Sequence, residues 1–151
     1  MEQGATDLIA AVEGLTDEQW ATICPDEQRS VGVLVHHVGA AYPEEADITT
    51  ALAREGGVPG LTWEAVNQGN QDEAESHEQV DKASALAQVR ENVATAATVV
   101  RGLTDEQLDR VALTDLHWEA PLTVQFFVEH HPIAHPYMHL EGIRAALGLN
   151  G

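Results

Sequence analysis

Apolar residues in this sequence recur with the period of an α-helix, whereas the alternating β-branched runs typical of strands are nearly absent. This pattern predicts an all-α protein. Four long helical segments carry it, at residues 5–13, 30–52, 86–101 and 122–147. Prolines inside the second and the last of these segments are expected to kink or bend them.

Residues 57–80 lack such a pattern. They are polar and acidic, and we interpret them as a long connector between the second and third long helices, with at most a short turn at residues 62–66. A length of 151 residues suits one domain with its own core. We therefore expect residues 1–151 to form a single domain.

The charge balance limits the choice of partners. Twenty-five acidic residues stand against 7 Lys and Arg residues, which gives a formal net charge of −18. Such a chain is repelled by phosphate backbones and anionic lipid, so we expect neither nucleic acid nor a membrane as a partner. The single cysteine, Cys24, and the lack of a recognisable signal peptide favour a cytoplasmic location.

The hexapeptide Gly-Leu-Thr-Asp-Glu-Gln occurs twice, at residues 14–19 and 102–107. In both copies Thr precedes Gln by three residues, which is the spacing of a capping box at a helix start. After each copy a hydroxyl residue opens an apolar segment that reaches a histidine pair, at residues 30–37 and 123–131. The repeat reflects either convergent use of a good cap or an ancient duplication, and the second correspondence favours duplication.

Seven of the eight histidines lie in or beside the two segments that contain these pairs. His131, His135 and His139 follow one another at i, i+4 spacing, so they share one face of the last helix. Neighbouring rings on such a face can bind one divalent metal ion, which prefers neutral imidazole nitrogens. In the second helix His37 borders the apolar stripe while His36 faces nearly opposite, so His37 is the better third ligand. The alternative is that these are ordinary core or surface histidines.

The remaining chemistry-bearing residues are less informative. Proline follows both His131 and His135 where metalloproteases carry a glutamate, which disfavours peptidase chemistry. Glu129 and Glu141 lie near the ligands, but we interpret them as surface residues and assign no catalytic acid or base. Cys24 has acidic neighbours and is expected to be unreactive. The three tryptophans, Trp20, Trp63 and Trp118, are expected to be core or pocket-wall residues, with the core favoured, and the alternative for Trp118 is the mouth of a site.

Two histidine segments carry a family resemblance. SVGVLVHHVGA at residues 30–40 and HPYMHLEGIRAALG at residues 135–148 resemble the DinB/YfiT-like family of four-helix bundles. The pair at residues 66–67 and the LTDEQL run after the third helix resemble the thiol-dependent isomerase and transferase branch. The resemblance implies an up-down-down-up four-helix bundle with a long connector between helices 2 and 3.

The resemblance also implies one divalent metal ion, usually Zn or Ni, held by His37, His135 and His139, with an open position for water or substrate. Thr123 and His135 are one residue further apart than is typical of the family, and a bulge or kink at Pro132 or Pro136 would absorb the difference. If the register shifts instead, His131 replaces His139 as the third ligand.

Three protein ligands and an open coordination position are typical of a catalytic metal site, whereas a structural site usually has four protein ligands. Together with the resemblance, this predicts a divalent-metal-dependent thiol S-transferase or isomerase that uses a low-molecular-weight thiol and a small-molecule substrate. The alternative is a non-catalytic bundle that binds metal or a small ligand as a sensor or store, or that forms a homodimer through its helix faces. A purely structural bundle without metal is the third interpretation.

Overall fold

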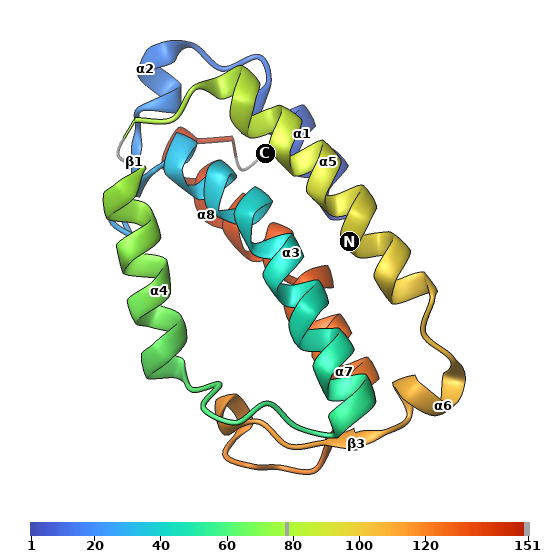
Figure 1. Cartoon of the computed structure of the whole chain (residues 1–151). Coiled ribbons are helices and arrows are strands. Elements are labelled where there is room, and N and C mark those ends of the chain that lie inside the picture. Colours follow the sequence, from blue (N-terminus) through green and yellow to red (C-terminus); the bar gives the residue numbers. More distant parts are fainter. Residues whose placement is uncertain (78, 150–151) are drawn as a thin grey trace.

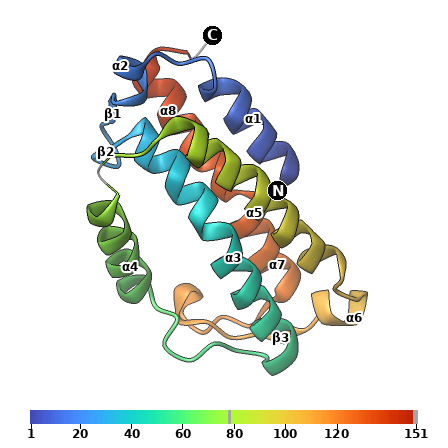
Figure 2. The same cartoon turned by 45° about the horizontal axis from the view of Figure 1, so that its top comes forward.

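The computed structural model describes residues 1–77 and 79–149. The bundle consists of α1 (Glu2–Val12), α3 (Val31–Glu55), α5 (Lys82–Arg101) and α8 (His135–Leu147). α3 packs against α5 and α8, and α1 packs against the same two helices from the other side. α3 and α5 run in one direction while α1 and α8 run in the other (Figures 1 and 2). The expected all-α fold with up-down-down-up topology is confirmed.

The two hexapeptide copies build the same succession of elements. Each forms a capping box in which Thr16 or Thr104 accepts a hydrogen bond from the backbone N–H three residues later. The helices that they open are α2 (Asp17–Trp20) and α6 (Asp105–Leu108). Each is followed by two short antiparallel strands, β1 (Ile23–Cys24) with β2 (Arg29–Ser30), and β3 (Val111–Ala112) with β4 (Leu122–Thr123). These strands were not predicted, because two residues are too few to show alternation.

Residues 57–80 are not the plain connector that the sequence suggested. They contain α4 (Trp63–Ser76), which buries none of its side chains. A helix without an apolar stripe has no hydrophobic period, so the pattern could not reveal it. Its N-terminus is capped by the Thr62 hydroxyl, which accepts a hydrogen bond from the N–H of Ala65. Side-chain hydrogen bonds at i, i+4 spacing, such as that between Gln68 and Asp72, stabilise this helix on its exposed surface.

The last long segment is interrupted between α7 (Val124–Val128) and α8. Residues Glu129–Ile133 form a π-helical turn that contains Pro132. A π turn accommodates one more residue than an α turn. The bulge expected from the spacing between Thr123 and His135 is therefore present. Pro43, in contrast, lies within an unbroken α3.

The core occupies two regions of the bundle. The larger lies among α1, α3, α5 and α8 and includes Leu8, Val38, Tyr42, Val89 and Ile143. The smaller lies at the far end of α3, where α3 meets α7, and includes Leu52, Val124 and Phe127. Among the described residues no helix is long and apolar enough to cross a lipid bilayer. The shared core holds α3 and α8 side by side, and this packing fixes the side chains that lie between the two helices.

Candidate metal centre

The side chains of His37, His135 and His139 meet between α3 and α8. The Nε2 atoms of His37 and His135 are 3.2 Å apart. The ring centroids lie 5.0 Å apart for His37 and His135, 5.2 Å for His37 and His139, and 4.7 Å for the two rings of α8. One nitrogen of each ring lies within 4.8 Å of the other two. The structure therefore brings together the three residues that the sequence singled out.

This arrangement fits a divalent metal ion. Nitrogens that lie about 2.0–2.1 Å from a tetrahedral ion are about 3.3 Å from one another. The separation of 3.2 Å between the two Nε2 atoms agrees with this value. The three side chains are only 9%, 11% and 13% exposed, so a bound ion would be largely shielded from solvent.

A carboxylate stands at the Nδ1 atom of each of the three rings. Glu27 lies 2.8 Å from His139 and is hydrogen-bonded to it. Glu45 lies 3.2 Å from His135, and Glu73 lies 3.4 Å from His37. In metal sites such carboxylates fix the ring orientation and raise the basicity of Nε2. The sequence analysis had considered Glu129 and Glu141 instead, because nothing in the pattern connects residues 27, 45 and 73 to the histidines.

The protonation states also suit a metal ligand. Burial lowers the pKa of His139, and the hydrogen bond to Glu27 only partly opposes this effect, so the ring is neutral at pH 7. For Glu27, burial acts to raise the pKa, but the hydrogen bond with His139 and nearby positive charge outweigh it, so the pKa falls below its usual value. The same balance lowers the pKa of Glu73, whose partners are His37 and His36. The neutral ring of His139 thus faces a carboxylate whose pKa is lowered.

Several polar atoms in this region lack a hydrogen-bond partner among the described residues. Glu45 Oε2, Glu73 Oε2 and His135 Nδ1 are all buried in this way. Buried polar atoms without partners are costly, and ionised carboxylates even more so. A divalent cation held by the three rings would balance this negative charge, which supports the fit of the site to a metal.

His131, the rival to His139 in the sequence analysis, lies in a different group. Its ring stacks on Phe127 with centroids 4.4 Å apart, and its Nε2 lies 3.2 Å from Nε2 of His117. His117 belongs to a short 3-10 helix, η1 (Asp115–His117). Burial, and to a lesser extent the nearby histidines, lower the pKa of His131 to about 4. The geometric triad therefore includes His139 and not His131.

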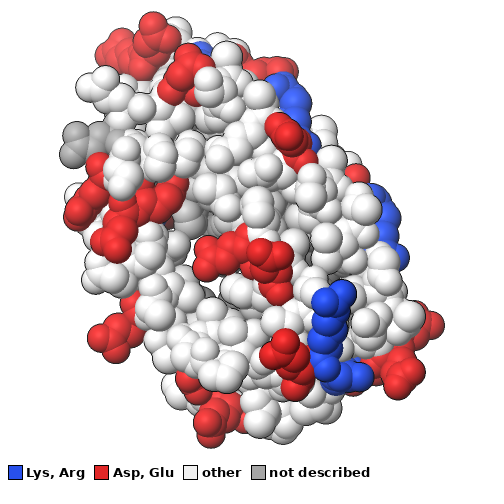
Figure 3. Space-filling view, viewed as in Figure 1, with Lys and Arg blue, Asp and Glu red and all other residues white. Residues whose placement is uncertain are grey.

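A cavity of about 450 Å³ opens beside the three histidines. Its walls come from α3, α4 and α8, and Trp63, Phe127 and His131 line its apolar end. Among the described residues, Arg29 is the only Lys or Arg that lines it, whereas four glutamates do so. In Figure 3, acidic side chains lie beside the hollow between α4 and α3. The cavity is large enough for a small organic molecule to reach the triad.

The core position that the sequence favoured is found for one of the three tryptophans, and a second one lines the cavity wall. Trp20 is in the core, where its indole Nε1 donates a hydrogen bond to the Val80 carbonyl oxygen. Trp63 is half-exposed and lines the large cavity, and Trp118 is 89% exposed. The composition of their neighbourhoods in sequence did not distinguish these three environments.

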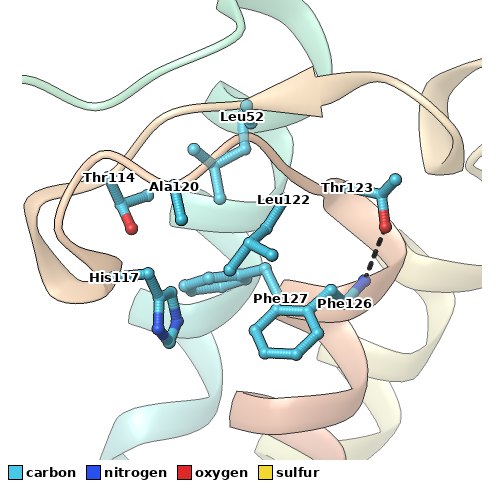
Figure 4. A pocket seen from close by; sticks show the side chains of 9 residues that line it. Leu52, Thr114, His117, Ala120, Leu122, Thr123, Phe126 and Phe127 are labelled. Carbon is cyan, nitrogen blue, oxygen red and sulfur yellow. Dashed lines mark hydrogen bonds between the residues drawn. The ribbon is translucent and has the colours of Figure 1, made fainter.

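A second hollow adjoins the apolar end of the large cavity, with which it shares Phe127, but it holds only about 10 Å³. Figure 4 shows its lining by Leu52, His117, Leu122 and Phe127, together with the hydrogen bond from the Phe126 N–H to the Thr123 hydroxyl that caps α7. This volume is too small for a substrate, so it is a packing gap.

Cys24 takes no part in the candidate centre. It is buried in β1. Burial raises its thiol pKa, and the nearby Glu27 and Asp26 raise it further. The thiol is therefore protonated at neutral pH, in agreement with the expected unreactive cysteine.

Comparison with known proteins gives two matches. Residues 1–143 match the DinB superfamily. Among solved structures, YfiT from Bacillus subtilis has a similar fold, with a TM-score of 0.67 and 22% sequence identity, over 97% of this chain and 83% of YfiT. That protein is described as a probable metal-dependent hydrolase with an unusual four-helix bundle topology. No curated protein is significantly similar in sequence. At 22% identity the likeness to YfiT concerns the fold alone.

Proposed function

This chain belongs to the DinB superfamily, and from that premise we propose that it is a metal-dependent enzyme in which His37, His135 and His139 hold one divalent ion, Zn²⁺ or Ni²⁺. We further propose that it transfers or isomerises a small-molecule substrate with the help of a low-molecular-weight thiol. The observation that carries the proposal is the meeting of three mostly buried imidazoles at the wall of a cavity of about 450 Å³.

The placement of the carboxylates favours a thiol over water as the nucleophile. Zn²⁺ deprotonates a thiol that coordinates to it, whereas it lowers the pKa of water only to about 7–9. Water attack therefore gains more from a nearby base. Glu27, Glu45 and Glu73 each stand at a ring Nδ1 atom. We infer that these contacts commit the three carboxylates to orienting the rings, although all three also line the cavity.

The cavity supplies the binding surface for the organic reactants. Trp63 and Phe127 offer flat apolar walls, and the guanidinium of Arg29 offers the single positive charge along the wall. Arg29 is positioned by a hydrogen bond of 3.0 Å from its Nη2 atom to the Asn70 carbonyl oxygen. Apolar packing would exclude water from the bound substrate, and Arg29 would orient an acidic group of the thiol or of the substrate.

Elemental analysis of the purified protein tests the metal site. We expect one tightly held Zn²⁺ or Ni²⁺ per chain, lost in both His37→Ala and His139→Ala. His130→Ala is the matched control, because His130 is an exposed residue outside the triad, and it should retain the ion. A wild-type protein without stoichiometric metal would leave only a structural bundle.

The reaction is tested with glutathione, cysteine and coenzyme A against a panel of electrophiles. We expect consumption of thiol by the metal-loaded protein and none by His139→Ala. Hydrolysis of ester or amide substrates without thiol consumption would contradict the thiol proposal in favour of a hydrolase. A metal-loaded protein with neither activity would favour the non-catalytic alternative of a metal or ligand store.

A further inference from the structure

A second group of possible ligands lies on the other side of His37. His36 from α3 and Glu73 and His77 from α4 each place one nitrogen or oxygen within 4.8 Å of the other two. His36 Nδ1 lies 2.6 Å from Glu73 Oε1, and His77 Nδ1 lies 3.9 Å from the same oxygen. Two imidazoles and a carboxylate form a ligand set that is well suited to Zn²⁺. None of these residues belongs to the triad of His37, His135 and His139.

The group is also accessible to an ion. The side chains of His36 and Glu73 are 15% and 22% exposed, and that of His77 is 45% exposed. His77 Nδ1 is hydrogen-bonded to the backbone oxygen of Glu73, 2.9 Å away, which leaves Nε2 of that ring for another partner. The rings of His36 and His77 stack with centroids 4.2 Å apart. Because His77 is half-exposed at the end of α4, an ion from solvent can reach this ring.

The attachment of α4 supplies an independent argument. This helix buries no side chain, so apolar packing contributes little to hold it against the bundle. Val66 packs, partly buried, against the smaller core region, and polar contacts join Trp63 Nε1 to the Leu116 carbonyl oxygen and Glu73 to His36. An ion bound by His36 from α3 and by two residues of α4 would cross-link the two helices.

We propose that His36, Glu73 and His77 form a second site for a divalent cation, which fastens α4 over the cavity. Glu73 also connects this site to the first one, because its Oε2 lies 3.4 Å from Nδ1 of His37. An ion at the second site attracts the negative charge of Glu73 and so weakens the support that this carboxylate gives to His37. By thermodynamic linkage the two sites therefore bind their ions with negative coupling.

Equilibrium dialysis of the chelator-stripped protein against a fixed micromolar level of free Zn²⁺, followed by elemental analysis, tests the second site. The wild-type chain should bind two ions. His77→Ala should bind one ion, because it lacks the second site. His139→Ala should also bind one ion, because it lacks the first site. His130→Ala, which changes an exposed histidine outside both groups, should still bind two.

Three results would overturn the second site: one ion in the wild type, two ions in His77→Ala, or a loss in His130→Ala. If only His139→Ala bound fewer ions than the wild type, the result would support the first site and contradict the second. If His77→Ala does not fold, NMR of the wild type decides. The ring resonances of His36 and His77 should shift only during addition of the second equivalent of Zn²⁺, and unchanged resonances would contradict the proposal.

Discussion

Glu27, Glu45 and Glu73 come from three separate segments, yet each places an oxygen at the Nδ1 atom of one ring of the triad. A carboxylate at Nδ1 keeps the proton on that nitrogen and directs the Nε2 lone pair towards the ion. The Glu27 contact, at 2.8 Å, is the shortest of the three. At the scale of single residues, the candidate centre therefore depends on the partners of the histidines as much as on the histidines.

Glu27→Gln tests this dependence. The amide retains the shape of the side chain but lacks the charge, so we expect the Kd for Zn²⁺ to rise about 10–100-fold. Asp26→Asn is the matched control, because Asp26 is the adjacent exposed carboxylate and its loss should leave the Kd unchanged. The measurement is a competition titration with a chromogenic chelator. Equal Kd values for Glu27→Gln and the wild type would show that Glu27 does not support the ion.

The half-buried ring of His131 predicts a pH dependence of stability. Its pKa is about 4 in the folded protein and about 6.5 in the unfolded chain. Between these two values the unfolded chain binds the proton and the folded one does not. The free energy of unfolding is therefore unaffected by this ring above pH 6.5, and it falls progressively as the pH drops towards 4.

Thermal unfolding in the presence of a chelator measures this effect without interference from metal. The wild-type Tm should fall between pH 7.5 and pH 5, and His131→Gln should show a smaller fall because the glutamine does not titrate. His130→Gln, which changes the exposed neighbour, should retain the wild-type slope. Identical slopes for His131→Gln and the wild type would assign the pH dependence to other groups.

At the scale of elements, α4 differs from the helices of the bundle. α3 and α5 bury apolar side chains along their length, whereas α4 buries none and is stabilised by its Thr62 cap and by surface hydrogen bonds. Helices with few buried contacts open locally at low cost in free energy. α4 also forms one wall of the large cavity, so its opening would expose that cavity.

Hydrogen–deuterium exchange followed by mass spectrometry tests this difference. In the metal-free protein, peptides from residues 63–76 should exchange much faster than peptides from residues 82–101. Saturating Zn²⁺ should slow exchange in α4 of the wild type, and this protection should be smaller in His77→Ala. Protection of α4 equal to that of α5 in the metal-free protein would contradict the prediction.

At the scale of the whole molecule, the formal net charge of −18 is a cost of folding. Compaction brings like charges together, and their repulsion lowers the free energy of unfolding. Figure 3 shows acidic side chains over much of one face, with the basic ones gathered mainly along one edge. The repulsion is therefore distributed over the surface and is accessible to screening by salt.

Raising the ionic strength should stabilise the protein. Screening shortens the range of the repulsion to about 8 Å at physiological ionic strength. We expect the Tm to rise with salt, by about 2–4 °C for each kcal/mol of relief. NaCl and KCl should act alike at equal ionic strength, because screening depends on charge and not on ion identity. A Tm that stays constant or falls with salt would contradict this account.

The sequence by itself determined the long helices of the bundle, the two repeated capping boxes, and the placement of the candidate ligand histidines on two of those helices. These features are local: an apolar period of 3.6 residues, a hydroxyl before a helix and an i, i+4 spacing are all visible within a few neighbouring residues. The extra residue between Thr123 and His135 was visible only by comparison with the family spacing, and the π turn at Glu129–Ile133 absorbs it. The family resemblance then indicated how the helices are ordered.

Only the tertiary structure decided which carboxylates support the rings, where His131 points, and how residues 63–76 are folded. Glu27, Glu45 and Glu73 are distant from their histidines along the chain, so no local pattern connects them to those rings. α4 has no apolar face, and its helical state depends on caps and on polar contacts with the bundle. Contacts between distant segments are set by packing of the whole chain, and a sequence pattern records only the faces that packing buries.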